Sequence, residues 1–131
     1  MNEKAKILLV EDNVALSGVI SFNLLRAGYQ VTAVSNGREA LDAIQKSRER
    51  FDLVLSDQQM PKMTGIQLCE HVREIPDYEH TPFILLTAKC MEIDVAKLQQ
   101  RLGLSMALPK PFSPSELLTC IEECLSSSCS G

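Results

Sequence analysis

The stretch LSDQQMPKMTG, residues 55–65, ends an apolar run on an acidic side chain and then turns sharply. The run FDLVLS (51–56) is nearly continuous in apolar character, as is typical of a strand buried on both faces of a parallel sheet. Asp57 follows at once, Met60-Pro61 redirects the chain, and Gly65 permits a close backbone approach at the start of a helix. We therefore expect Asp57 at the carboxyl end of a buried strand, followed by a tight turn.

Four further apolar runs are distributed along the chain. They are AKILLV (5–10), QVTAV (30–34), PFILLT (82–87) and SMALP (105–109). The segments between and after the runs carry apolar residues at helical spacing. Strands that alternate with helices predict an α/β fold of (βα)5 type: a doubly wound three-layer sandwich around a parallel five-stranded sheet.

Signals for helix packing and helix ends support this pattern. The first helix carries an apolar stripe formed by Leu16, Val19, Ile20 and Leu24. Asn36 is placed to cap the second helix, and Gly103 to end the fourth. The pattern Ser113-Pro114-Ser115-Glu116 predicts a capped start for the last helix.

The bulk composition indicates one globular domain. The chain has 131 residues, 45% hydrophobic and 23% charged, and a net charge of −4. This charge argues against direct nucleic-acid binding, and no stretch is apolar enough for a signal peptide or a membrane span. We expect a cytoplasmic protein with a domain over residues 1–125, and with residues 126–131 as a flexible tail or the start of a linker.

The cysteines do not indicate a disulfide framework, because their number is odd and no C-x-x-C pair occurs. They are Cys69, Cys90, Cys120, Cys124 and Cys129. A metal site formed by the last three is one interpretation. We favour the other, in which all five are small apolar residues in a reducing compartment.

Polar side chains follow four of the predicted strands. They are Glu11-Asp12, Asp57, Thr87-Ala88 and Pro109-Lys110-Pro111. Any one of these acids could simply be a turn former or a helix cap. Because ligands of open α/β sheets bind beyond the carboxyl ends of the strands, we expect these side chains to converge on one site.

The acids at this edge repel one another. Two like charges about 4 Å apart repel by roughly 4 kcal/mol at an effective dielectric of about 20. Glu11, Asp12 and Asp57 therefore need a cation, or one of them must hold a proton. If a cation binds, oxygen ligands favour Mg²⁺ or Mn²⁺. A carboxylate beside such an ion and Lys110 suits phosphoryl transfer, in which the carboxylate itself can be the nucleophile.

The chain resembles a known family from about Lys6 to Leu125. The motifs are VEDN (10–13), DQQMPKMTG (57–65), LLTAK (85–89) and LPKPF (108–112), which together resemble the receiver domain of two-component response regulators. The resemblance implies a flavodoxin-like fold with strand order 2-1-3-4-5. It also implies a signalling switch that accepts a phosphoryl group from a histidine kinase or a histidine phosphotransfer protein.

The resemblance also assigns roles to residues. It makes Asp57 the phosphoacceptor, with Mg²⁺ bound by Asp12, Asp57 and the main-chain carbonyl of Gln59, and by Glu11 mostly through water. Thr87 would bind the phosphoryl group, Lys110 would pair with it, and Ala88 would keep the approach open. The domain would catalyse its own phosphotransfer and dephosphorylation but act mainly as a regulator, with an output domain after the tail and no membrane partner.

Two positions depart from the family pattern. Residue 58 is usually apolar, and here it is Gln58. The family places an aromatic residue, most often Tyr, three positions before the lysine, where this chain has Ala107. Met106, Met91 or the fourth helix could fill the resulting gap. We expect the response to phosphorylation in the loop and helix from Ala88 to Leu102, and not in an aromatic rotamer.

Two rival functions are retained, and a third is weaker than either. The first is a receiver-like interaction module that is never phosphorylated. The second is a small phosphatase with an aspartyl nucleophile, although such a site should carry a second acid where this chain has Gln59. The third is flavin binding, which the acidic loop EDNVALS (11–17) disfavours because a phosphate cradle should be neutral and rich in Gly, Ser or Thr.

The first predicted helix has a second apolar stripe, formed by Val14, Gly18, Phe22 and Leu25. One helix cannot bury both stripes against a single sheet. Either Phe22 packs at the edge of the core, or the stripe is a docking face for a helical histidine phosphotransfer partner.

Overall fold

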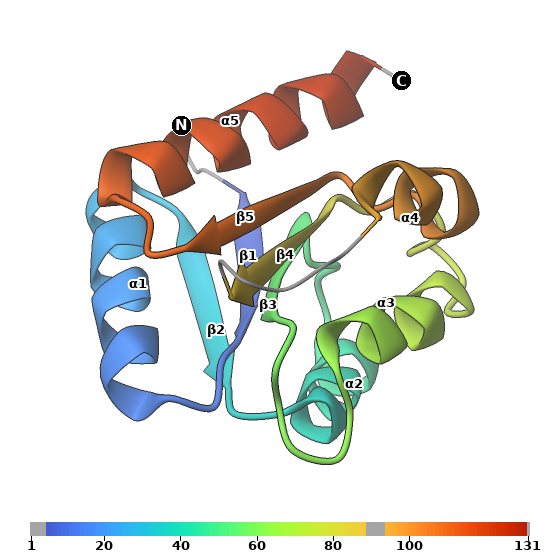
Figure 1. The fold of residues 1–131 in the computed structure, drawn as a ribbon. Helices are drawn as coiled ribbons and strands as arrows, with labels where there is room; N and C mark the ends of the chain where they lie inside the picture. The colour runs from blue at the N-terminus through green and yellow to red at the C-terminus, as the bar shows by residue number, and fades with distance from the viewer. Residues whose placement is uncertain (1–4, 89–93, 131) are drawn as a thin grey trace.

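The computed structural model describes residues 5–88 and 94–130. Its sheet consists of five parallel strands in the order β2-β1-β3-β4-β5 (Figure 1). The strands are β1 (Lys6–Val10), β2 (Gln30–Val34), β3 (Leu53–Asp57), β4 (Phe83–Ala88) and β5 (Met106–Lys110). The predicted fold class and strand order are confirmed.

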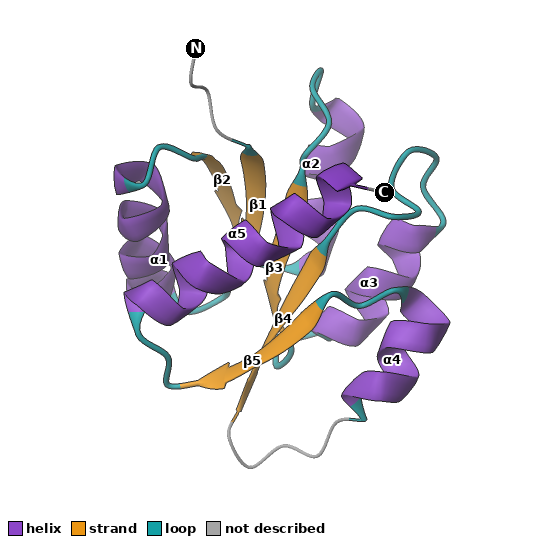
Figure 2. Cartoon of the chain, turned by 90° about the horizontal axis from the view of Figure 1, so that it is seen from above, coloured by secondary structure: helices purple, strands orange, loops and turns teal. Residues whose placement is uncertain are grey.

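Five helices in the described part of the chain cover the two faces of this sheet. They are α1 (Val14–Arg26), α2 (Gly37–Lys46), α3 (Gly65–Arg73), α4 (Val95–Leu102) and α5 (Pro114–Ser130). Helices α1 and α5 lie on one face, and α2, α3 and α4 lie on the other (Figures 1 and 2). None of the helices among the described residues is long and apolar enough to cross a membrane.

Each central strand contributes side chains alternately to two cores, since successive residues of a strand point to opposite faces. In β1, Ile7 and Leu9 pack in the core beneath α1 and α5, whereas Leu8 and Val10 pack in the core beneath α2, α3 and α4. All four side chains are fully buried. This burial on both faces explains the continuous apolar runs in the sequence.

The third strand is shifted from its predicted bounds. It begins at Leu53 instead of residue 51, and it includes Asp57. Phe51 is buried but lies outside the strand, and its backbone N–H donates to the hydroxyl of Tyr78 at 2.9 Å. Phe51 therefore packs in the core beneath α2, α3 and α4 without being part of the strand.

Helix α1 buries a narrower stripe than predicted. Ile20 and Leu24 are buried, but Val19 is 56% exposed, so its assignment to the buried stripe was wrong. A helix on one sheet face buries an arc of roughly 100°, and Val19 falls outside it. Phe22 is 59% exposed, which rules out the interpretation that it packs at the edge of the core.

The predicted helix ends are confirmed. The side chain of Asn36 accepts a hydrogen bond from the backbone of Glu39 at 2.9 Å, and Gly103 ends α4 in the left-handed conformation, with φ of 67°. Ser113 and Glu116 form a reciprocal capping box at the start of α5, with hydrogen bonds of 2.8 and 3.1 Å.

Helix α5 continues to Ser130, so residues 126–130 are helical where the sequence predicted a flexible tail. Adding one residue to an existing helix costs little, because each residue gains a backbone hydrogen bond and serine is only mildly unfavourable. Whether this segment leads into a linker stays a prediction.

Candidate functional site

The strand register brings the predicted polar residues to one edge of the sheet. Val10 pairs with Ser56, which places Glu11 level with Asp57. Asp57 pairs with Leu86 on β4, and Ala88 pairs with Lys110 on β5. The carboxyl ends of β1, β3, β4 and β5 therefore meet, as the sequence predicted.

Three carboxylates form a cluster at this edge. Glu11, Asp12 and Asp57 each offer an oxygen within 4.8 Å of the others. Glu11 and Asp57 are 2% and 5% exposed, whereas Asp12 faces solvent. Oxygen donors that converge at this spacing fit a hard divalent cation such as Mg²⁺.

Lys110 is the counter-charge of the two buried acids. Its ammonium lies 3.1 Å from Oδ1 of Asp57 and 3.3 Å from Oε1 of Glu11. Burial by itself lowers the pKa of Lys110, but the hydrogen bond and charge of Asp57, together with the charge of Glu11, outweigh it and raise the pKa above its ordinary value. Lys110 therefore remains a cation near neutral pH.

Glu11 is held by the chain around it. Its Oε2 accepts a hydrogen bond from the backbone of Asn13 at 3.0 Å, and its own backbone N–H donates to Val34 at 3.1 Å. The pKa of Glu11 is raised, mainly because the side chain is buried and in part because of the charge of Asp57. The hydrogen bond from Asn13 and the charge of Lys110 lower the pKa but do not cancel this effect. Glu11 and Asp57 thus share the ammonium of Lys110, and Asp12 lies in the same cluster, which leaves negative charge for a cation to neutralise.

Gly65 is required for the path of the turn after β3. A Cβ atom at this position would lie 2.5 Å from the main-chain oxygen of Asp57 and 2.5 Å from Cδ1 of Leu85. The Gly65 N–H donates to the carbonyl of Gln58 at 3.1 Å. The predicted close backbone approach at Gly65 is confirmed, and it ties the start of α3 to the residue beside Asp57.

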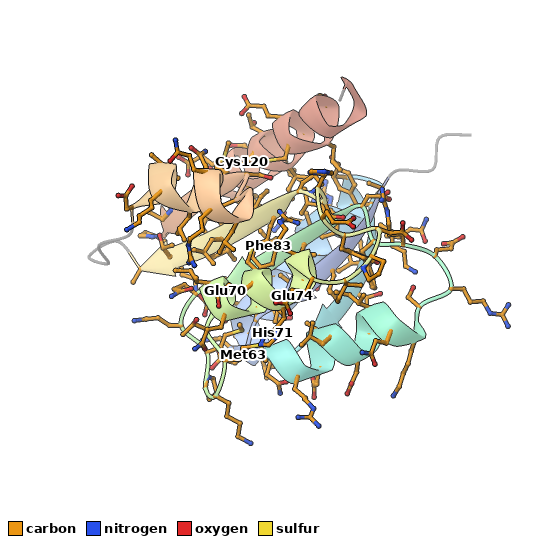
Figure 3. The ribbon with its side chains drawn as sticks, turned by 90° about the vertical axis from the view of Figure 1, so that its right-hand side faces the viewer. Met63, Glu70, His71, Glu74, Phe83 and Cys120 are labelled. Carbon is orange, nitrogen blue, oxygen red and sulfur yellow. The ribbon has the colours of Figure 1, made fainter. Side chains whose placement is uncertain are left out.

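The methionines of this turn serve packing. Met60 is buried in the core beneath α2, α3 and α4, and Met63 packs against the same core. Met63, labelled in Figure 3, lies so close to Gly37 at the start of α2 that a Cβ atom there would collide with its side chain. The turn is thereby fastened between two helices.

Thr87 and Ala88 lie at the end of β4, where Thr87 is 7% exposed. Gln59, whose carbonyl the resemblance assigns to the metal, is exposed in the turn after β3. The roles of Thr87 and Gln59 stay predictions. Met91 lies outside the described residues.

Ala107 faces the core beneath α2, α3 and α4, whereas its neighbour Met106 packs in the opposite core. Met106 therefore does not fill the space beside Ala107, because adjacent strand residues point to opposite faces. Helix α4 packs in the core that Ala107 faces, through Val95, Leu98 and Leu102. Of the three predicted fillers, α4 fits the structure.

The described cysteines behave as apolar residues. Cys69 and Cys124 are buried, and burial raises the pKa of each thiol to about 11. Cys120 is partly exposed, and burial and neighbouring glutamates also raise its pKa. Thiolate ligation by Cys120 and Cys124 is therefore disfavoured. Cys90 and the side chain of Cys129 lie outside the described part.

Sequence reasoning missed the contacts of Gln58. Its side chain is 9% exposed and accepts a hydrogen bond from the backbone of Ile66 at 2.8 Å. The departure from an apolar residue at this position was the available signal, but the sequence did not indicate the partner.

With the fold and the site defined, the family follows from comparison with known proteins. Residues 7–122 match the model of the response regulator receiver domain, and the chain belongs to this family of two-component signalling domains. It is 37% identical over 126 residues to the transcriptional regulatory protein CpxR homolog of Haemophilus influenzae, covering 96% of this chain and 52% of the relative. It is 38% identical over 112 residues to the alkaline phosphatase synthesis transcriptional regulatory protein PhoP of Bacillus subtilis, covering 86% and 45%. The chain thus spans about half the length of these relatives.

Solved structures agree with this result. The chemotaxis response regulator CheY4 of Vibrio cholerae superposes with a TM-score of 0.80 at 38% identity, covering 92% of this chain and 98% of that one. The receiver domain of the sensor histidine kinase PA1611 of Pseudomonas aeruginosa has a TM-score of 0.80 at 31% identity, covering 93% and 98%. That structure has a magnesium ion coordinated in its active-site cleft.

Proposed function

We propose that this domain is a phosphorylation-dependent signalling switch whose phosphoacceptor is Asp57. The observation that carries the proposal is the convergence of Asp57 with two further carboxylates and with the ammonium of Lys110 at one sheet edge. The phosphoryl donor is the phosphohistidine of a histidine kinase or a histidine phosphotransfer protein. Phosphoryl transfer asks a protein mainly for positioning and charge neutralisation, and this constellation offers both.

In the proposed reaction, a carboxylate oxygen of Asp57 forms a bond to phosphorus while the phosphorus–nitrogen bond of the phosphohistidine breaks and the imidazole leaves. Lys110, already 3.1 Å from Asp57, offsets the charge of the phosphoryl oxygens. Thr87 donates a hydrogen bond to the same oxygens, and the small side chain of Ala88 leaves room for the donor.

The proposed metal ligands are Asp12, Asp57 and the main-chain carbonyl of Gln59, with Glu11 acting mostly through water. The bound Mg²⁺ would neutralise charge between the carboxylates and the incoming phosphoryl group. The donor set supports this assignment, because its three carboxylate oxygens lie within 4.8 Å of one another. Asp12→Asn should weaken Mg²⁺ binding, as measured by calorimetric titration.

The experiment is labelling with acetyl phosphate, with and without Mg²⁺, followed by intact-protein mass spectrometry. We expect one phosphoryl group per chain only when Mg²⁺ is present, and none on the Asp57→Asn protein. An interaction module that is never phosphorylated would show no labelling under any condition. A phosphatase would turn over small phosphate esters, which we do not expect, since Gln59 offers an amide where an acid is needed.

We further propose that α1 is the docking face for a helical phosphohistidine donor. Four large apolar side chains of α1 are exposed: Val14 is 82%, Val19 56%, Phe22 59% and Leu25 57% exposed. The guanidinium of Arg26 lies over the ring of Phe22, 5.7 Å from its centre. A groove of about 330 Å³ runs beside this face, lined by residues that include Glu11 and Val14. The apolar face is therefore continuous with the proposed phosphorylation site.

The output is proposed to lie in another domain. The two relatives above are transcriptional regulatory proteins about twice as long as this chain. DNA binding, if the full protein has it, would belong to a domain after residues 126–131, because the receiver itself carries a net charge of −4.

A further inference from the structure

Gln58 is a buried polar residue directly after the proposed phosphoacceptor. Its backbone N–H donates to the carbonyl of Leu86 on β4 at 2.8 Å, and its carbonyl accepts from Gly65 at 3.1 Å. Its side-chain Oε1 accepts from the backbone N–H of Ile66 at 2.8 Å. Gln58 is thus hydrogen-bonded to β4 by its main chain and to the start of α3 by both its main chain and its side chain.

These hydrogen bonds complete the amino-terminal cap of α3. The first backbone N–H groups of a helix have no partner within the helix and need one elsewhere. Here Gly65 donates to the carbonyl of Gln58, Ile66 donates to the Gln58 side chain, and Gln67 donates to Oγ1 of Thr64 at 3.1 Å. Two of the three groups therefore depend on Gln58.

The same contacts close the turn between β3 and α3. Residues 59–64 form a loop that leaves Gln58 and returns to it at Gly65 and Ile66. A buried amide without a hydrogen bond is destabilising. A loop conformation that moves Ile66 away from Gln58 is therefore unfavourable for two reasons, because both the Gln58 side-chain oxygen and the Ile66 N–H lose their partner. An apolar residue at this position could not make the side-chain contact.

We propose that Gln58 is a positioning residue, which fixes the loop carrying Gln59 relative to Asp57 and thereby sets the affinity of the site for Mg²⁺. This inference rests on the proposed function, in which the carbonyl of Gln59 is a metal ligand. Gln58 itself binds neither the metal nor the phosphoryl group. It restricts the loop before the metal binds, so that Mg²⁺ binding costs less conformational entropy.

The test compares two substitutions at the start of α3. Gln58→Met keeps the length of the side chain but removes the acceptor for Ile66. The matched control, Gln67→Met, removes a hydrogen bond of similar kind at the same helix start, the 3.0 Å contact from Thr64 N–H to Gln67 Oε1, and leaves Gln58 intact. Gln58→Leu is a second variant without the acceptor, should Gln58→Met fail to fold.

Two quantities are measured on each protein: the exchange rate of the Ile66 amide without metal, and the dissociation constant for Mg²⁺ from calorimetry. We expect Gln58→Met to accelerate Ile66 exchange and to weaken Mg²⁺ binding, each by about fivefold or more, since a lost hydrogen bond is worth about 1 kcal/mol. Gln67→Met should change Mg²⁺ binding by less than about twofold. Gln58→Glu retains an acceptor and should restore slow exchange at Ile66.

The outcomes separate this inference from the function on which it rests. If the wild-type protein binds Mg²⁺ and Gln58→Met binds it equally well, the positioning role is wrong and the proposed function stands. Unchanged exchange at Ile66 in Gln58→Met would also overturn the inference, because the hydrogen bond would then not restrict the loop. If the wild-type protein does not bind Mg²⁺, the metal site of the proposed function fails, and this inference fails with it.

Discussion

Lys110 bridges the two buried carboxylates of the site, with its ammonium 3.1 Å from Asp57 and 3.3 Å from Glu11. Lys110 therefore offsets the repulsion between two acids, one directly after β1 and one at the end of β3. A phosphoryl group on Asp57 would add oxygens that compete with Glu11 for this ammonium. Phosphorylation of Asp57 can therefore weaken the ion pair between Lys110 of β5 and Glu11 after β1.

Lys110→Ala should lower the free energy of unfolding of the metal-free protein near neutral pH by roughly 1–2 kcal/mol, because two buried acids lose their counter-charge while Lys110 is partly exposed. The pKa of Lys110 is raised in the fold, so its contribution is present below its ordinary value of 10.5 and is lost as the pH rises through the higher folded value. Urea unfolding of both proteins at a series of pH values measures this. A difference that grows at alkaline pH would contradict the assigned ion pair.

Gly65→Ala should destabilise the protein by about 3 kcal/mol, because the new Cβ would collide with the main chain of Asp57 and with Leu85. Gly18 provides the matched control: it is exposed on α1, and a Cβ there meets nothing within 4 Å. Gly18→Ala should stabilise the protein by about 0.5–1 kcal/mol through helix propensity. Chemical denaturation of both variants tests the pair. Equal effects of the two substitutions would show that the close approach at Gly65 is not what requires glycine.

Phe22→Ala should slow phosphoryl transfer from a phosphohistidine protein, while labelling by acetyl phosphate proceeds at the wild-type rate. The side chain is 59% exposed, so its removal should change stability by less than about 0.5 kcal/mol. The two rates are measured by quenching the labelling reaction with each donor at a series of times. A parallel loss with both donors would indicate damage to the site or fold, and no loss with either would exclude Phe22 from docking.

The conformational response should appear in α4. Its carboxyl end is anchored, because Arg73 donates hydrogen bonds to the carbonyls of Leu102 and Gly103. Arg101 also pairs at 3.2 Å with Glu70, which is labelled on α3 in Figure 3. No ring is available at Ala107 to move with Thr87. Amide exchange with and without beryllofluoride, a phosphoryl mimic, should therefore change in residues 88–102, most in the first turn of α4, and only modestly. Changes confined to residues 105–125 would contradict this.

The sequence predicted those parts of the fold that depend on local patterns. Asp57 and Lys110 each follow an apolar run, so their meeting at one edge follows from parallel strands alone. Val19 could not be placed, because both stripes of α1 are apolar and helical periodicity does not say which one faces the sheet. The contact between Gln58 and Ile66 could not be foreseen either, since it depends on the path of the turn between them.

The most direct test of the central claim is to locate the phosphoryl group. The protein is treated with acetyl phosphate and Mg²⁺, the aspartyl phosphate is reduced with borohydride to homoserine, and the modified residue is mapped by peptide mass spectrometry. We predict homoserine at residue 57, dependent on both acetyl phosphate and Mg²⁺, with no homoserine at Asp12 and no 5-hydroxynorvaline, the corresponding product of a glutamyl phosphate, at Glu11. Modification at another carboxylate, or stoichiometric labelling that persists in the Asp57→Asn protein, would contradict the account.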